Sequence, residues 1–156
     1  MINYTKADLT KLEEIIKLRL DFLREDVGPQ TPENEATMKE HLEVYLKNHL
    51  NRDCFVFTAV EDEKIISIAF LLILEKPANP SFLHGSIGTI MNVYTVPQKR
   101  CQGIAGNVIK QIIEFGKTQN LDFLDLKAAP MGYPLYKKLG FDDADNRCKG
   151  MVYRWK

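Results

Sequence analysis

The first part of the chain has apolar residues at intervals of three and four, the spacing of an amphipathic helix. This pattern predicts a helix that begins at Asp8 or Thr10 and ends near Arg24, with an apolar stripe formed by Leu9, Leu12, Ile16, Leu20 and Leu23. Thr10 is followed three residues later by Glu13, which fits a capping box at the helix start.

A second helix is predicted after the GPQTP segment at residues 28–32, which interrupts the first. Thr31 can cap this helix with Pro32 at its first position, and the helix runs to about Leu50. Because its residues are more polar than those of the first helix, we expect it at the surface, as one wall of a cleft.

The hydrophobic period then changes from helix to strand. Residues 54–60 and 65–74 are rich in strand-forming residues and flank a short polar turn, so they predict an antiparallel hairpin. Further strands are expected at residues 2–5, 88–96, 121–128 and 151–155.

Two helices are predicted in the second half, one from Ala105 to about Asn120 and a short one over residues 131–139, closed by Gly140. The resulting order, β-α-α-β-β-β-α-β-α-β, predicts a three-layer α/β fold with a mixed sheet. We see no repeat, linker or low-complexity tract, so residues 1–156 are expected to form a single domain.

Composition excludes several classes of protein. The 156 residues are 45% hydrophobic and 27% charged, as in ordinary soluble proteins, and 21 basic residues balance 21 acidic ones. A net charge of zero argues against nucleic acid as a partner. The 3 cysteines and 3 histidines are scattered without ligand spacing, so neither a disulfide framework nor a metal site is indicated.

The chain start is charged and does not resemble a signal peptide. The longest nearly uncharged apolar run, residues 65–74, is too short to cross a bilayer. We therefore expect a cytoplasmic protein without a membrane partner. The oligomeric state is left open, a homodimer included.

Residues 96–107, VPQKRCQGIAGN, join a predicted strand to a predicted helix. The helix start presents unpaired N–H groups and a partial positive charge, Lys99 and Arg100 add full charges, and Gly103 permits close approach of a ligand. These features suit an anion, most naturally a phosphate. The segment contains neither GxxxxGK[ST] nor GxGxxG, so the two common nucleotide motifs are not supported.

The arrangement Arg100-x-x-Gly103-x-Ala105 matches the R/Q-x-x-G-x-G/A signature of the GNAT superfamily, the acyl-CoA-dependent N-acyltransferases. One helix and one strand later, the LYKKLGF segment at residues 135–141 resembles the LYxKLGF element of that family. The chain thus resembles a GNAT protein, which implies a three-layer α-β-α fold whose mostly antiparallel mixed sheet is splayed at the acyl-CoA site.

The resemblance implies that acetyl-CoA is the acyl donor and that no metal takes part. The main chain of Val93, Tyr94 and Thr95 would pair with the pantetheine arm. The diphosphate would lie against the loop and helix start, where the binding residues are Arg100, Cys101, Gln102, Gly103, Ile104, Ala105 and Gly106.

For the chemistry, the resemblance implies that Tyr136 protonates the departing CoA thiolate. A general base is harder to find, because residues 88–96 contain no acid; Asp125 is the candidate, with His84 a weaker one. Carboxylates near the end of the first helix could attract a cationic acceptor: Asp21, Glu25 and Asp26.

The leading hypothesis is an N-acetyltransferase that transfers the acetyl group directly to a primary amine, carried by a small molecule or a peptide. A second hypothesis is a non-enzymatic acyl-CoA sensor or interaction module, because no base is obvious. A third is a phosphate-ligand binder unrelated to CoA.

Overall fold

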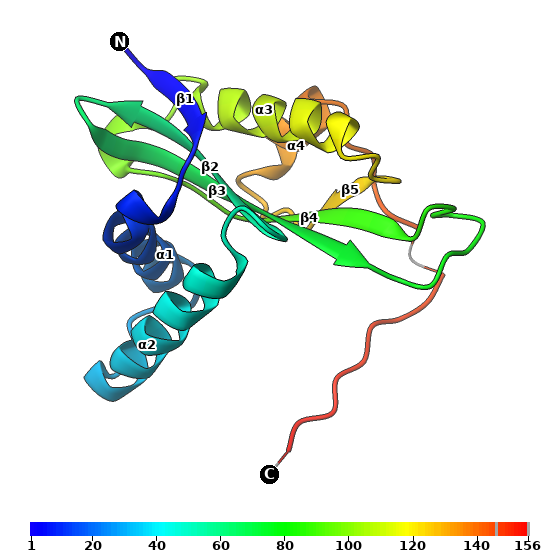
Figure 1. Cartoon of the computed structure of the whole chain (residues 1–156), viewed down its shortest axis with the longest axis horizontal. Helices are drawn as coiled ribbons and strands as arrows, with labels where there is room; N and C mark the ends of the chain where they lie inside the picture. The colour runs from blue at the N-terminus through cyan, green and yellow to red at the C-terminus, as the bar shows by residue number, and fades with distance from the viewer. Residues whose placement is uncertain (146, 156) are drawn as a thin grey trace.

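The computed structural model describes residues 1–145 and 147–155. A five-stranded sheet lies between two layers of helices (Figure 1). Its elements, in chain order, are β1 (Asn3–Lys6), η1 (Leu9–Lys11), α1 (Leu12–Val27), α2 (Pro32–His49), β2 (Cys54–Glu61), β3 (Lys64–Glu75), β4 (Ser86–Thr95), η2 (Pro97–Lys99), α3 (Ile104–Thr118), β5 (Leu124–Leu126) and α4 (Tyr133–Lys138).

The strands lie in the order β1-β2-β3-β4-β5. Neighbours from β1 to β4 are antiparallel, whereas β5 runs parallel to β4 because the crossover helix α3 joins them. The predicted hairpin is β2 and β3, and the prediction of a mixed, mostly antiparallel sheet is confirmed.

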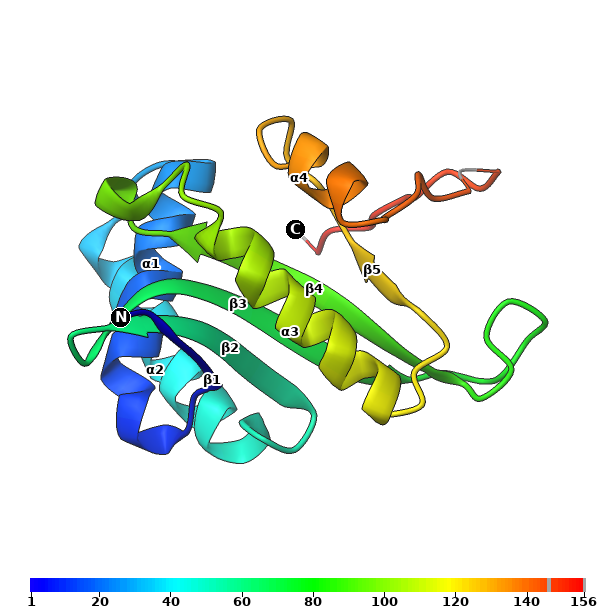
Figure 2. The ribbon, with the colours of Figure 1, turned by 90° about the horizontal axis from the view of Figure 1, so that it is seen from above.

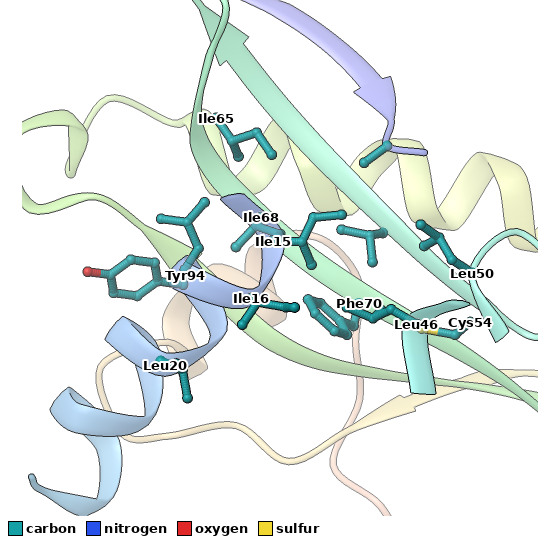
Figure 3. Packing of buried hydrophobic residues seen from close by; sticks show 13 residues of the cluster. Ile15, Ile16, Leu20, Leu46, Leu50, Cys54, Ile65, Ile68, Phe70 and Tyr94 are labelled. Carbon is teal, nitrogen blue, oxygen red and sulfur yellow. The ribbon is translucent and has the colours of Figure 1, made fainter. Parts of the chain in front are cut away.

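The two faces of the sheet carry separate hydrophobic clusters. On one face Ile15 and Ile16 of α1 pack near Ile68 and Phe70 of β3, as Figure 3 shows. On the other face α3 lies along the sheet and contributes buried residues such as Ile109 to the second cluster (Figure 2). The predicted three-layer α-β-α arrangement is therefore confirmed. No helix in the described ranges is long and apolar enough to traverse a lipid bilayer.

Helix α2 covers its face only partly. Thr31 caps it by accepting a hydrogen bond from the N–H of Asn34 at 3.1 Å, and Pro32 takes the first position, as predicted. Leu46 is its one fully buried residue. The polar sequence thus keeps α2 at the surface, where its inner side can line a cavity.

The sheet opens between β4 and β5. The two strands pair only where Gly88, Thr89 and Ile90 face residues 124–126, and from Met91 onward β4 has no strand on this side within the described chain. Gly88 makes the paired end compact, because a Cβ there would lie 2.6 Å from the Leu124 side chain. The predicted splay is thereby present.

A β-bulge lies where β4 leaves β5. The pairing of β4 with β3 shifts register between Ile68 and Phe70, and Asn92 takes a left-handed conformation with φ 54°. Met91, which precedes the bulge, and Tyr94, which follows it, both pack on the face of the sheet that α1 covers. Since side chains alternate along a strand, the extra residue puts Met91 and Asn92 on the same face.

Three local predictions are corrected. The capping box is wrong: Asp8 caps the short η1 helix by accepting a hydrogen bond from the Thr10 N–H at 2.9 Å, and α1 begins only at Leu12. The strand predicted over residues 121–128 is reduced to residues 124–126, because only that stretch lies beside β4. The short helix is Tyr133–Lys138 rather than residues 131–139.

The strand predicted at residues 151–155 is also wrong. Met151 and Tyr153 are 91% and 79% exposed, and the segment runs away from the sheet (Figure 1). Alternating apolar residues favour a strand, but a strand forms only beside an edge that can bond its main chain.

The LYKKLGF segment ends α4 in a Schellman motif. The Phe141 N–H donates to the Tyr136 carbonyl at 3.0 Å and the Gly140 N–H to the Lys137 carbonyl at 3.1 Å, while Gly140 has φ 97°. The Phe141 ring meets the Tyr136 ring edge-on at 5.9 Å. The glycine therefore fixes the turn that holds Tyr136 in place.

We expect Gly140→Ala to lower the free energy of unfolding by about 1 kcal/mol, because a side chain disfavours positive φ. Nothing lies within 4 Å of the added Cβ, so a steric clash is not the cause. The melting temperature should fall by roughly 2–4 °C. Gly150→Ala, an equally open position without positive φ, is the control and should leave it unchanged. Equal melting temperatures for both variants would contradict this account.

Candidate functional site

The connection from β4 to α3 has an unusual backbone. After η2, Cys101 has φ 60° and Gly103 has φ 75°, so two residues within three positions are left-handed. Such a conformation turns successive N–H groups toward one side of the chain, as in anion-binding nests. The glycine predicted to allow close approach has nothing within 4 Å of its Cβ position.

The amides of this connection are free. The N–H groups of residues 101–106 donate no hydrogen bond to any residue of the described chain, and the first such bond of the helix is from Asn107 to the Gly103 carbonyl. Because α3 begins here, the positive end of its helix dipole lies beside these N–H groups and increases the positive potential around them. The residues predicted to bind a diphosphate therefore present unused donors at one place.

The two cations of the loop are already paired. Lys99 forms an ion pair with Glu61. Arg100 binds both oxygens of Glu25 at 2.8 and 2.9 Å, and its Nε–H donates to the Thr95 carbonyl at 2.8 Å. In this structure the candidate anion site thus consists of main-chain donors, and a phosphate contact by Arg100 stays a prediction.

The end of β4 lies beside these donors. The Tyr94 hydroxyl donates to Glu25 at 3.2 Å, and burial, with Glu25 nearby, raises the pKa of Tyr94. The Thr95 hydroxyl shares a hydrogen bond of 2.8 Å with Ser67 on β3. These side chains are engaged, whereas the edge of residues 91–95 facing away from β3 has no strand along it in the described chain. The main chain of Val93, Tyr94 and Thr95 thus lies on an unpaired sheet edge, as pairing with a ligand would require.

Tyr136 is 9% exposed and lies in the cluster beneath α3. Burial raises its pKa, so the hydroxyl stays protonated at neutral pH. Tyr136 also lines the groove described next, so its hydroxyl can donate to a ligand there. Tyr133 differs: its hydroxyl donates to Asp143 at 2.9 Å.

A groove of about 830 Å³ runs beside β5 and α4, and both Tyr136 and Asp125 line it. Asp125 is exposed and accepts a hydrogen bond from the Thr89 hydroxyl at 2.6 Å. His84 lies apart from the groove's lining, where its ring and its N–H bind Asp122. This contact holds the pKa of Asp122 below its usual range and gives His84 a structural role.

A second cavity, of about 590 Å³, lies between α1, α2 and the sheet. Sequence analysis missed one of its polar residues, Arg19, and the neighbouring Asn92. A signal for Arg19 exists, because it stands three residues after Ile16 and four before Leu23, on the apolar stripe of α1. In the ranges that the structure covers, no cluster of three or more His, Cys, Asp or Glu side chains could hold a metal ion.

Comparison with known proteins places this geometry in a family. The model of the Acetyltransferase (GNAT) family matches residues 13–141. A predicted acetyltransferase from Clostridium acetobutylicum, solved with acetyl-CoA, is 30% identical, with a TM-score of 0.84 and coverage of 97% of this chain and 96% of that one. A search of curated proteins gave no significant match.

More distant structures share the fold. A GCN5-related N-acetyltransferase from Ralstonia eutropha JMP134 is 22% identical, with a TM-score of 0.81 and coverage of 97% and 99% of the two chains. An acetyltransferase from Trypanosoma brucei is 16% identical, with a TM-score of 0.71 and coverage of 97% and 100%. The resemblance and the fold class predicted from the sequence are both confirmed.

We expect Cys101→Gly to raise the free energy of unfolding by up to about 1 kcal/mol, because glycine adopts the left-handed backbone of residue 101 without the penalty that a side chain carries. The melting temperature, followed by circular dichroism, should rise. Cys148→Gly removes the other exposed cysteine, where φ is not positive, and should not raise it. A fall for Cys101→Gly would show that the cysteine side chain makes a stabilising contact.

Proposed function

The chain belongs to the acetyltransferase (GNAT) family, and we propose that this acyltransferase moves an acetyl group from acetyl-CoA to a primary amine by direct attack of the amine. The observation that carries the proposal is the set of free N–H groups at residues 101–106, next to the unpaired edge of β4. We further propose that the acceptor is a small molecule or a peptide and that the reaction takes place in the cytoplasm.

Acetyl-CoA has the chemistry that these groups complement. Its diphosphate suits the free amides and the helix dipole at the start of α3. Its pantetheine arm contains amides, which can bond the main chain of residues 93–95 as an added strand bonds a sheet edge. The Thr95 carbonyl already accepts from Arg100, so we assign the arm to the remaining main-chain groups of this edge.

Acetyl-CoA supplies a thioester, whose carbonyl carbon the amine attacks; the C–N bond forms and the C–S bond breaks. A main-chain N–H near Tyr94 would polarise the carbonyl as an oxyanion hole does. Tyr136 would donate its proton to the departing sulfur, since burial keeps its hydroxyl protonated. A base or water takes the proton that the amine loses.

Asp125 is our candidate for that base, because it lines the same groove as Tyr136. Its hydrogen bond to Thr89 leaves the second carboxylate oxygen free for a water. Glu25, which contacts the end of β4, is occupied by Arg100 and Tyr94.

A non-enzymatic acyl-CoA sensor is the second candidate function. The observation that favours it is that Asp125 is exposed and no acid stands on β4. A sensor would bind acetyl-CoA without releasing thiol to any amine. Free-thiol release across a panel of amines therefore separates the two functions.

Gly103→Glu should abolish the stabilisation by acetyl-CoA, because it adds bulk and negative charge beside the free amides. In wild type, ligand at about 100 times its Kd should add about 2.7 kcal/mol to the free energy of unfolding. The measurement is thermal unfolding with and without acetyl-CoA. Gly28→Glu is a matched control, since Gly28 also has positive φ and open space around it. No stabilisation of wild type would overturn both CoA-binding functions.

Tyr136→Phe should lower kcat by about 100-fold, as expected for loss of a general acid, while stabilisation by acetyl-CoA is retained. The substitution keeps the ring that packs against Phe141. Tyr133→Phe removes a hydroxyl bonded to Asp143 and should keep full turnover. Unchanged turnover in Tyr136→Phe would remove the residue from the proton-donor role.

A further inference from the structure

The cavity between α1, α2 and the sheet has a mostly apolar lining with one cation. Its volume of about 590 Å³ is that of a small-molecule site. The lining residues are Arg19, Leu23, Thr37, Met38, His41, Leu42, Tyr45, Phe70, Leu72 and Met91. An apolar ligand of amino-acid size fits such a space.

Arg19 lacks an anionic partner in the described chain. Its one hydrogen bond runs from Nη1 to the Asn92 Oδ1 at 3.0 Å, and its guanidinium lies over the Phe22 ring at 6.0 Å. Burial lowers the pKa of Arg19, and the charge of Asp26 opposes that shift without an ion pair. A guanidinium in an apolar wall with most of its donors unused favours an anion.

Asn92 supplies an independent observation. It is 4% exposed, and its Nδ2 is buried without a hydrogen-bond partner in the described structure. Such groups are rare because the lost hydrogen bond is costly. The bulge of β4 puts this amide on the face of α1 and next to Val93, at the unpaired edge. Asn92 does not line the cavity itself; its Oδ1 accepts from Arg19, which does, and so holds the guanidinium at the cavity wall.

No carboxylate of the described residues forms an ion pair with Arg19. Asp21 is paired with Lys17 and Arg24 at 2.6 and 2.9 Å, and Glu25 is paired with Arg100. Two of the three carboxylates predicted to attract a cationic amine thus have cations of their own, and the third, Asp26, acts on Arg19 only through its charge. Recognition of the acceptor therefore falls to the uncompensated positive group.

We propose, as a deepening of the function proposed above, that this cavity binds the acceptor and that the acceptor is an α-amino acid with an apolar side chain. The carboxylate binds Arg19, which Asn92 holds in place, and the side chain enters the apolar part of the cavity. One carbon separates the carboxylate from the amine, so the amine lies beside Val93 and the open edge of β4. The N-terminus of a peptide has no carboxylate on that carbon, so Arg19 disfavours it as an acceptor.

The test compares L-leucine, L-methionine and L-phenylalanine with their primary amides, which keep the amine and the side chain but lack the charge. With wild type and acetyl-CoA, thiol release should show a KM at least tenfold lower for the acids. Arg19→Met should raise the KM for the acids at least tenfold and leave that for the amides unchanged. Lys110→Met, at an exposed position on α3 across the sheet from this cavity, is the control and should change neither.

Equal KM values for acids and amides in wild type, or an equal change in both KM values in Arg19→Met, would overturn this inference. Neither result would contradict the proposed transferase activity. Thermal unfolding with L-phenylalanine alone reports binding without turnover. If no acceptor releases thiol, a stabilisation by L-phenylalanine that is lost in Arg19→Met supports the pocket while the transferase proposal fails. Absence of that stabilisation as well overturns the inference.

Discussion

The proposed site of this molecule depends on main-chain groups that have no hydrogen-bond partner within the described chain. A buried N–H or carbonyl that lacks a hydrogen bond is costly, so such groups must face solvent or a ligand. Here they concentrate where β4 leaves β5 and where α3 begins, at residues 91–95 and 101–106. Neither stretch is held by pairing along its open side. Its position is set instead by the long β3–β4 pairing and by the buried side of α3.

The bulge at Asn92 determines which side chains at the end of β4 face α1 and which face α3. Without it, strict alternation would put Tyr94 on the α3 face, whereas the structure has it among the α1 residues and Val93 beneath α3. One inserted residue therefore directs Tyr94 and Asn92 toward α1 and Val93 toward α3. The edge proposed to bind the cofactor and the cavity proposed to bind the acceptor both use β4. The bulge determines which side chains of β4 lie on the side of the acceptor cavity.

The sequence predicted best those features that short segments determine. Helix α3 and its N-terminal loop follow from a 3.6-residue period and one glycine. Tyr136 was found through the family resemblance of seven consecutive residues, which also form the Schellman motif that holds it. The last strand failed because a strand depends on a neighbouring edge, which no local pattern specifies. Arg19 was missed for a similar reason: its partner, Asn92, is 73 residues away and turns toward it only through the bulge.

Charge pairing around the site bears on how an amine could react there. An amine attacks only in its neutral form, and the carboxylate of an α-amino acid stabilises the neighbouring ammonium. In the proposed arrangement Arg19 binds that carboxylate and cancels this stabilisation, which lowers the pKa of the amine. Asp21 and Glu25, which would act in the opposite direction, are neutralised by Lys17, Arg24 and Arg100. The same cation that selects the acceptor thus reduces the demand for a strong base, in keeping with a β4 strand that carries no acid.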